Sequence, residues 1–230
     1  MQGSEVLNEW DSKQWLKGAD VAIPQARWLP WERLSAARDV VGDIEFPVVA
    51  KLISNQIPHK TEVGGVCLNL NTPEQVEDAI ASMVDALQNS GVDVIPDGVM
   101  VESMVRDVVC ELLVGVRRDS QFGQVMVIAS GGVLVELLDD AQTLVLPTDQ
   151  RKVLRALKRL RCFPLLGGFR GRAPADIDQV VSAISGIARL VEKHAAEVVE
   201  MDINPLMVQT HKVTVADALV RLKGGFASSD

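Results

Sequence analysis

A histidine and a lysine shortly before a glycine pair carry the first candidate chemistry of this sequence. Residues 58–66 read PHKTEVGGV, so His59 precedes Gly64 and Gly65. Near neutral pH an imidazole can act as a nucleophile toward phosphorus or as an acid-base group. Glycines let backbone amides approach an anion closely, although a plain hairpin turn explains the same pair. The segment therefore predicts either a phosphate site or a turn that carries a surface histidine.

Lys51 is the second candidate, because it lies within an apolar run that predicts a β-strand. The run reads FPVVAKLIS at residues 46–54 and is rich in β-branched side chains. A lysine that is buried in such a strand needs an anionic partner. A phosphate is one possible partner, and the alternative is a lysine whose ammonium reaches solvent at the strand end.

The C-terminal segment, residues 198–222, predicts a β-hairpin that gathers oxygen-bearing side chains. If its turn centres on residues 210–211, Asn204 lies opposite Asp217, and Asp202 lies two residues along on the same face. Carboxylate and amide oxygens suit a hard cation, and Mg²⁺ typically takes one or two protein carboxylates plus phosphate oxygens. The alternative is that Asp202 and Asn204 only start a turn before the following proline.

Further polar residues stand in apolar or glycine-rich surroundings. Glu102 and Glu111 lie in the runs VMVESMV and VCELLVGV. A carboxylate that points to an interior needs a donor, such as a ribose hydroxyl or an adenine amino group, whereas an exposed edge strand needs none. Gly131-Gly132 and the loop LLGGFRGR, which contains Arg170, are either anion-binding loops or ordinary connections.

The elements that must position these residues alternate between helices and strands. Apolar spacing and capping residues predict helices at residues 4–18 (cap Ser4), 72–91 (cap Thr72), 148–160 and 174–194. Extended runs predict strands at residues 46–54, 97–105, 108–119, 123–130 and in the C-terminal hairpin. This order predicts an α+β protein of two α/β lobes, residues 1–95 and 96–230, that enclose one cleft.

The composition excludes several classes of protein. The chain has 230 residues, of which 47% are apolar, and a net charge of -8, which argues against a nucleic-acid or membrane-surface partner. Its three cysteines are far apart and lack a CxxC spacing, so we expect no disulfide framework and a cytoplasmic location. The most apolar run, residues 122–138, is interrupted by polar residues and is shorter than the ~20 residues of a membrane helix.

The order of these signals is typical of an ATP-grasp nucleotide site. The sequence resembles the ATP-grasp domain, or β subunit, of the ADP-forming acyl-CoA synthetases, from about Leu7 to Leu222. The most specific segments are FPVVAKLISNQIPHKTEVGGV, LLVGVRRDSQFGQVMVIASGGVLVELL, FPLLGGFRG, and EMDINPLMV together with the following VADALVRL. The chain departs from the family at Thr61-Glu62, where Ser-Asp is more usual, and at IASGG, where a glycine usually precedes the pair.

The resemblance implies an ATP-grasp fold, the cofactors ATP/ADP and Mg²⁺, and a role for each candidate residue. The residues expected to bind nucleotide are Lys51, Gly64 and Gly65 at the phosphates, Glu102, Ser103 and Met104 beside adenine, and Glu111 near ribose. The residues expected to bind metal are Asn204 and Asp217, supported by Asp202. The resemblance also implies that His59 carries the phosphoryl group on its way to ADP.

The resemblance further implies an acid–CoA ligase (ADP-forming) that is incomplete by itself. The family's reaction needs a CoA-binding domain and a ligase domain, on an α-type partner subunit or fused to the chain, and we find no GxGxxG fingerprint here. A small carboxylic acid and CoA would be bound through that partner. Two alternatives stay open: a synthetase-like regulatory or binding domain of a protein lysine acetyltransferase, and a purely structural assembly domain.

Overall fold

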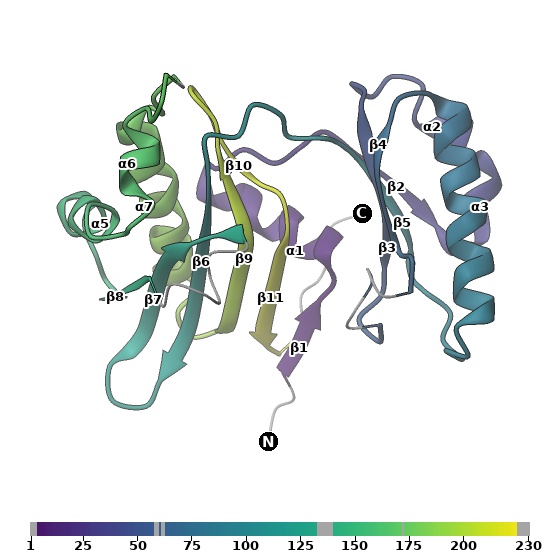
Figure 1. Ribbon diagram of the computed structural model, residues 1–230. Helices are drawn as coiled ribbons and strands as arrows, with labels where there is room; N and C mark the ends of the chain where they lie inside the picture. The colour runs from purple at the N-terminus through teal and green to yellow at the C-terminus, as the bar shows by residue number, and fades with distance from the viewer. Residues whose placement is uncertain (1–3, 58–59, 61–62, 133–139, 172, 225–230) are drawn as a thin grey trace. The chain divides into compact units, whose positions relative to one another are not determined.

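The computed structural model describes residues 4–57, 60, 63–132, 140–171 and 173–224 (Figure 1). The chain forms two compact units, one of Pro24–Met104 and one of Met1–Ile23 together with Val105–Asp230. This division differs from the predicted lobes 1–95 and 96–230, because the first 23 residues belong with the C-terminal part of the chain and residues 96–104 belong to the smaller unit.

The smaller unit is an antiparallel four-stranded sheet with helices on one face (Figure 1). Its strand order is β2-β5-β3-β4, with β2 at Ala26–Pro30, β3 at Val48–Ile53, β4 at Val66–Leu70 and β5 at Gly98–Ser103. The helical segments are η2 at Trp31–Ala36, α2 at Ala37–Val40 and α3 at Pro73–Asn89.

Helix α3 confirms the helix that the apolar spacing predicts. The Thr72 side chain caps it by accepting a hydrogen bond from the Gln75 amide, 3.3 Å away. Its buried residues lie at helical spacing, at Val76, Ala79, Ile80, Met83 and Leu87, and all of them except Ala79 belong to the core cluster shared with the sheet. Because side chains alternate along a strand, Lys51 lies on the sheet face opposite to the face that Ala50 and Leu52 present to this core.

The larger unit contains a seven-stranded antiparallel sheet in the described residues. Its strand order is β1-β11-β9-β6-β7-β8, and β10 also pairs with β9. The strands are β1 at Ser4–Leu7, β6 at Cys110–Asp119, β7 at Gly123–Ser130, β8 at Ala141–Val145, β9 at Val198–Val208, β10 at Val213–Val215 and β11 at Ala218–Lys223. The helices are α1 at Glu9–Leu16, continued by η1 at Lys17–Ala19, α5 at Gln150–Leu157, α6 at Phe163–Leu166 and α7 at Ile177–Lys193.

The helices of the larger unit share one apolar core with the sheet. Trp15 of α1 and Ile184 of α7 belong to the same buried cluster as Leu112 and Val114 of β6. Exposure alternates along β6, so that Glu111 and its same-face neighbours are only partly buried. The sheet therefore has one face covered by helices and one face, with Glu111, that is more accessible within this unit.

The first segment corrects the predicted helix at residues 4–18. Residues Ser4–Leu7 form β1, which pairs with Val220–Lys223 of β11 at the sheet edge. The helix begins only at Glu9, and its cap is Asn8 rather than Ser4, with the Asn8 side chain 2.9 Å from the Asp11 amide. Pairing with a distant strand outweighs the local helical pattern, because it satisfies backbone groups that a sheet edge exposes.

The C-terminal hairpin confirms the predicted register. Val208 pairs with Val213 and Leu206 with Val215, which places the turn at residues 210–211. The same register continues into β11, where Asp202 lies opposite Leu219. The geometry that the metal-site prediction assumes is therefore present in the larger unit.

Candidate functional site

Lys51 and Glu102 form a nearly buried ion pair in the smaller unit. Residue 49 pairs with Glu102 and Lys51 pairs with Met100, so the two charged residues are diagonal neighbours on one sheet face. The Lys51 Nζ lies 2.8 Å from Glu102 Oε1, and their side chains are 13% and 3% exposed. Glu102 is thus an anionic partner that keeps the Lys51 ammonium in place on the face opposite α3.

The glycine pair forms a tight turn directly before β4. Gly64 has a φ of +71°, which favours glycine. The Gly65 amide donates to the Lys60 carbonyl at 2.7 Å, and the Gly65 carbonyl accepts from the Leu52 amide at 2.7 Å. The Gly65 amide is therefore used within the turn. His59 lies outside the described residues.

Replacing Gly65 with alanine is expected to destabilise the smaller unit. An added Cβ would lie 2.8 Å from the Lys60 carbonyl oxygen and 3.1 Å from Leu52 Cβ, so the turn must shift at a cost of roughly 1–3 kcal/mol. Denaturant unfolding measures this loss. Gly42→Ala is the matched control, because its added Cβ would meet no atom closer than 3.7 Å. Equal stability of the two variants would contradict this account of the turn.

Ser103 and Met104 hold the end of β5 against neighbouring backbone. The Ser103 amide donates to the Gln25 carbonyl and the Met104 amide to the Pro47 carbonyl, each at 2.9 Å. The Ser103 hydroxyl donates to the Glu45 carbonyl at 2.8 Å. Both amides are thus used within the smaller unit, and the contact of this segment with adenine stays a prediction.

In the larger unit, Glu111 is held by the glycine pair that follows β7. The Gly131 amide donates to the Glu111 carbonyl at 2.7 Å. A Cβ on Gly131 would lie 2.8 Å from the Glu111 carbonyl carbon, and one on Gly132 would lie 2.8 Å from the Glu111 carboxylate. Close packing on Glu111 therefore accounts for both glycines. The sequence pattern does not predict this contact between Glu111 and the glycine pair.

Asn204 and Asp217 are neighbours where β9 meets the start of β11. The Asn204 amide donates to the Asp217 carbonyl at 3.2 Å. The Oδ1 of Asp202, two residues earlier, would lie 3.9 Å from a Cβ placed on Gly115 of the adjacent strand. Partial burial and, secondly, the Glu200 carboxylate raise the pKa of Asp202. These residues thus bring together the Asp202 carboxylate, which the charge of Glu200 repels, and the oxygen atoms of Asn204 and Asp217.

This donor set fits Mg²⁺ that also binds phosphate oxygens. Among the described residues, no group of three or more His, Cys, Asp or Glu side chains could hold a metal ion. Mg²⁺ needs no such cage, since it usually takes one or two protein carboxylates and completes its shell with waters and substrate phosphates. Asp217, Asp202 and the Asn204 amide would supply the protein part of such a shell.

The predicted site residues therefore fall into two groups, one in each unit. Lys51 and Glu102 are brought together in the smaller unit, and Asn204 and Asp217 in the larger one. The cleft that the two lobes are expected to enclose stays a prediction. Arg170 is exposed and has a φ of +52°. Its guanidinium lies over the Phe169 ring, 5.2 Å from the ring centroid, and this contact gives Arg170 no role in either group.

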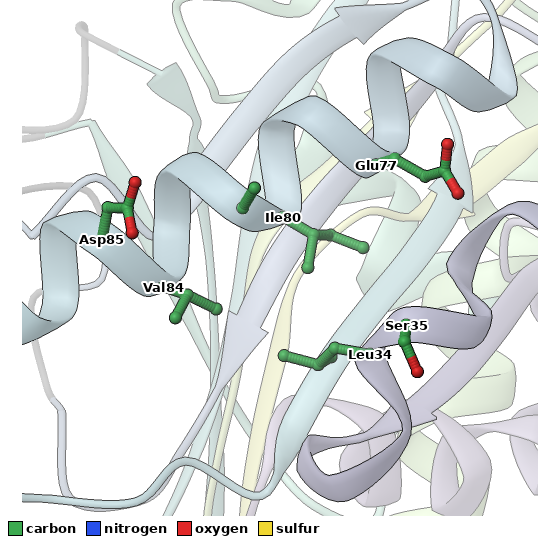
Figure 2. A pocket seen from close by; sticks show the side chains of 7 residues that line it. Leu34, Ser35, Glu77, Ile80, Val84 and Asp85 are labelled. Atoms are coloured by element: carbon green, nitrogen blue, oxygen red, sulfur yellow. The ribbon is translucent and has the colours of Figure 1, made fainter.

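A shallow groove in the smaller unit contains none of the predicted site residues. It has a volume of about 340 Å³ and is lined by Leu34, Ser35, Glu77, Ile80, Ala81, Val84 and Asp85. Figure 2 shows the apolar side chains of α3 beside Leu34, with the carboxylates of Glu77 and Asp85 at the rim. The Glu77 carboxylate lies 3.9 Å from the Arg38 guanidinium, and none of the lining residues is a lysine or arginine that could bind phosphate, so this groove does not suit a nucleotide.

Comparison with known proteins identifies the class of this chain. Residues 1–222 match the family model of the ATP-grasp domain. The chain therefore belongs to the ATP-grasp family. It is 30% identical to the β subunit of acetate–CoA ligase (ADP-forming) II from Pyrococcus furiosus, over 97% of this chain and 94% of that subunit.

Two further matches connect the chain with the same enzymes. Acetate–CoA ligase (ADP-forming) I from Archaeoglobus fulgidus is 35% identical over 79% of this chain, a match that spans 26% of that longer protein. Acetyl-coenzyme A synthetase 1 of Ca. Korarchaeum cryptofilum, solved with coenzyme A and Mg-AMPPCP and with its phosphohistidine segment pointing towards the nucleotide binding site, has a TM-score of 0.80. It is 30% identical and covers 95% of this chain and 93% of that chain.

These findings confirm the predicted family and the ATP-grasp fold. The relatives are ligases, and the Pyrococcus match is a β subunit, so the chain belongs to the ATP-grasp family that includes the β subunits of the ADP-forming acetate–CoA ligases. The alternative of a lysine acetyltransferase module receives no support from them. In the described part of the chain, no helix is long and apolar enough to cross a bilayer.

Proposed function

We propose that this chain binds ATP or ADP with Mg²⁺ and exchanges a phosphoryl group between the nucleotide and His59. It would do so as the nucleotide subunit of a cytoplasmic synthetase that joins a small carboxylic acid to CoA. The CoA-binding and ligase functions would belong to an α-type partner subunit or a fused domain. The observation that carries the proposal is the proximity of Asn204 and Asp217, whose side-chain oxygens could bind a metal. Their backbones are joined by a hydrogen bond of 3.2 Å from the Asn204 amide to the Asp217 carbonyl, in a chain that belongs to the ATP-grasp family.

Each residue group has a defined task in this proposal. Lys51, held by Glu102, neutralises phosphate charge, and the turn at Gly64-Gly65 covers the phosphates. Asn204 and Asp217 hold Mg²⁺, which shields the phosphate oxygens when it is bound. Catalysis then rests on positioning and charge neutralisation, as in other phosphoryl transfers.

The covalent step needs only the nucleotide and the histidine. A ring nitrogen of His59 attacks the γ-phosphorus of ATP, a P–N bond forms, and the P–O bond to ADP breaks so that ADP leaves with the electron pair. The reverse step returns the phosphoryl group to ADP. Glu102, Ser103, Met104 and Glu111 would orient the nucleoside, and the partner would use the phosphoryl group to activate the acid.

The names of the relatives support the partner and the cofactor. The Pyrococcus relative is a β subunit, and the Archaeoglobus relative is a longer single protein, so both a separate partner and a fused domain have precedents. The solved synthetase holds coenzyme A and Mg-AMPPCP. Free Cys67, Cys110 and Cys162 fit a reducing compartment.

Calorimetric titration with a non-hydrolysable ATP analogue tests the proposal. The protein is titrated with and without Mg²⁺ and in the presence of its CoA-binding partner. We expect saturable binding that depends on Mg²⁺. Absence of nucleotide binding under both conditions would overturn the proposal and would favour a structural assembly domain.

A further inference from the structure

An ion pair within helix α1 is almost completely buried and has no part in the proposed chemistry described above. The Lys13 Nζ lies 3.0 Å from Glu9 Oε1, one helical turn away, and the two side chains are 1% and 3% exposed. Removing two charges from water is expensive, and apolar residues of similar size often stabilise a protein as well or better. The pair is therefore poorly explained by stability alone.

The Lys13 ammonium connects α1 to the candidate metal site. It donates a hydrogen bond of 2.7 Å to the carbonyl of Ala216, which lies far away in sequence. Ala216 directly precedes Asp217, and the Ala216 amide donates to the Pro205 carbonyl at 3.1 Å. The residue before that proline, Asn204, donates its own amide to the Asp217 carbonyl. Charge-assisted hydrogen bonds such as the one from Lys13 are stronger than neutral ones.

We propose that Lys13, held by Glu9, is a positioning residue that fixes the backbone at Ala216 and thereby aims the Asp217 carboxylate at Mg²⁺. The inference rests on the proposed function, because it assumes that Asp217 binds the metal. Asp217 lies in the connection between β10 and β11, where its carbonyl accepts a hydrogen bond from the Asn204 amide. The hydrogen bond from Lys13 adds a constraint on the backbone of this connection, at Ala216.

Ser12 offers a matched control on the same helix. Its hydroxyl is fully buried, accepts a hydrogen bond from the Val220 amide at 3.0 Å and donates to the Leu7 carbonyl at 3.3 Å. Ser12 thus joins α1 to β1 and β11 but does not contact Ala216 in these hydrogen bonds. Ser12→Ala perturbs the packing of α1 and leaves the Lys13 contact in place.

The test measures Mn²⁺ affinity by electron paramagnetic resonance in the presence of a non-hydrolysable ATP analogue. The variant is the double substitution Glu9→Gln/Lys13→Met, which removes both charges of the pair together, so that neither is left buried without the other. We expect its Mn²⁺ affinity to fall about 10-fold, the lower end of the effect of outer-shell partners of a metal. Ser12→Ala is expected to lower the melting temperature while keeping the wild-type Mn²⁺ affinity.

The outcomes separate this inference from the proposed function. If the wild type and Asp217→Asn bind Mn²⁺ equally, the metal site itself is wrong and both proposals fail. If Asp217→Asn loses affinity and the double variant keeps the wild-type value, only the role of Lys13 is wrong. If Ser12→Ala lost as much Mn²⁺ affinity as the double variant, the role of Lys13 would also be wrong, because the loss would then result from disturbed packing of α1 in general. Lys13→Arg keeps a buried cation and is therefore expected to retain a higher Mn²⁺ affinity than the double variant.

Discussion

Replacing Asp217 with asparagine is expected to weaken the Mg²⁺-dependent binding of nucleotide by about 100-fold or more. Outer-shell residues at metal sites already contribute 10–100-fold to affinity, and a direct carboxylate ligand contributes at least as much as the upper end of this range. The substitution keeps the size of the side chain and removes one negative charge. Calorimetric titration of the ATP analogue at fixed Mg²⁺ measures the change.

Asp178→Asn is the control for the change in net charge. Asp178 is exposed in the first turn of α7, and α7 packs on the helical side of the sheet. Its substitution changes the charge of the protein by the same amount but is expected to leave nucleotide affinity within about 2-fold of the wild type, because exposed charges at a distance are screened. Equal losses in the two variants would refute a specific role for Asp217.

Replacing Lys51 with methionine is expected to have two large and separable effects. Glu102 would remain as a buried carboxylate without this partner, which costs about 3–5 kcal/mol of the free energy of unfolding. The phosphates would also lose a charge-assisted hydrogen bond, which lowers nucleotide affinity roughly 10- to 100-fold. Denaturant unfolding measures the first effect and calorimetry the second.

The double variant Lys51→Met/Glu102→Gln distinguishes the two roles of the lysine. It leaves no buried charge of this pair uncompensated, so we expect it to recover most of the lost stability. It does not restore a cation at the phosphates, so nucleotide affinity should stay low. If the double variant recovered both stability and affinity, Lys51 would be a structural residue only.

The sequence predicted best those features that depend on local periodicity or on simple pairing. Helix α3 follows from its apolar spacing and the Thr72 cap. The proximity of Asn204 and Asp217 follows from the register of one hairpin, because antiparallel pairing is determined once the turn is placed. In both cases, segments near each other in sequence decide the structure.

Features that depend on distant segments could not be predicted in this way. Ser4–Leu7 has a helical pattern but becomes a strand, since β11, more than two hundred residues later, pairs with it. The Lys51–Glu102 ion pair and the packing of Gly131 and Gly132 on Glu111 require the order of strands in each sheet. Strand order is a tertiary property, and a single sequence read for periodicity does not contain it.

Transfer of labelled phosphate from ATP to His59 is the direct test of the proposed phosphoryl transfer. The wild type and His59→Ala are incubated with γ-labelled ATP, Mg²⁺ and the CoA-binding partner, and the label on this chain is separated from the label on the partner. We expect an acid-labile phosphate on the wild-type chain that is absent from His59→Ala and that is discharged on addition of ADP. Equal labelling of this chain in both proteins, or none in the wild type despite nucleotide binding, would contradict this transfer.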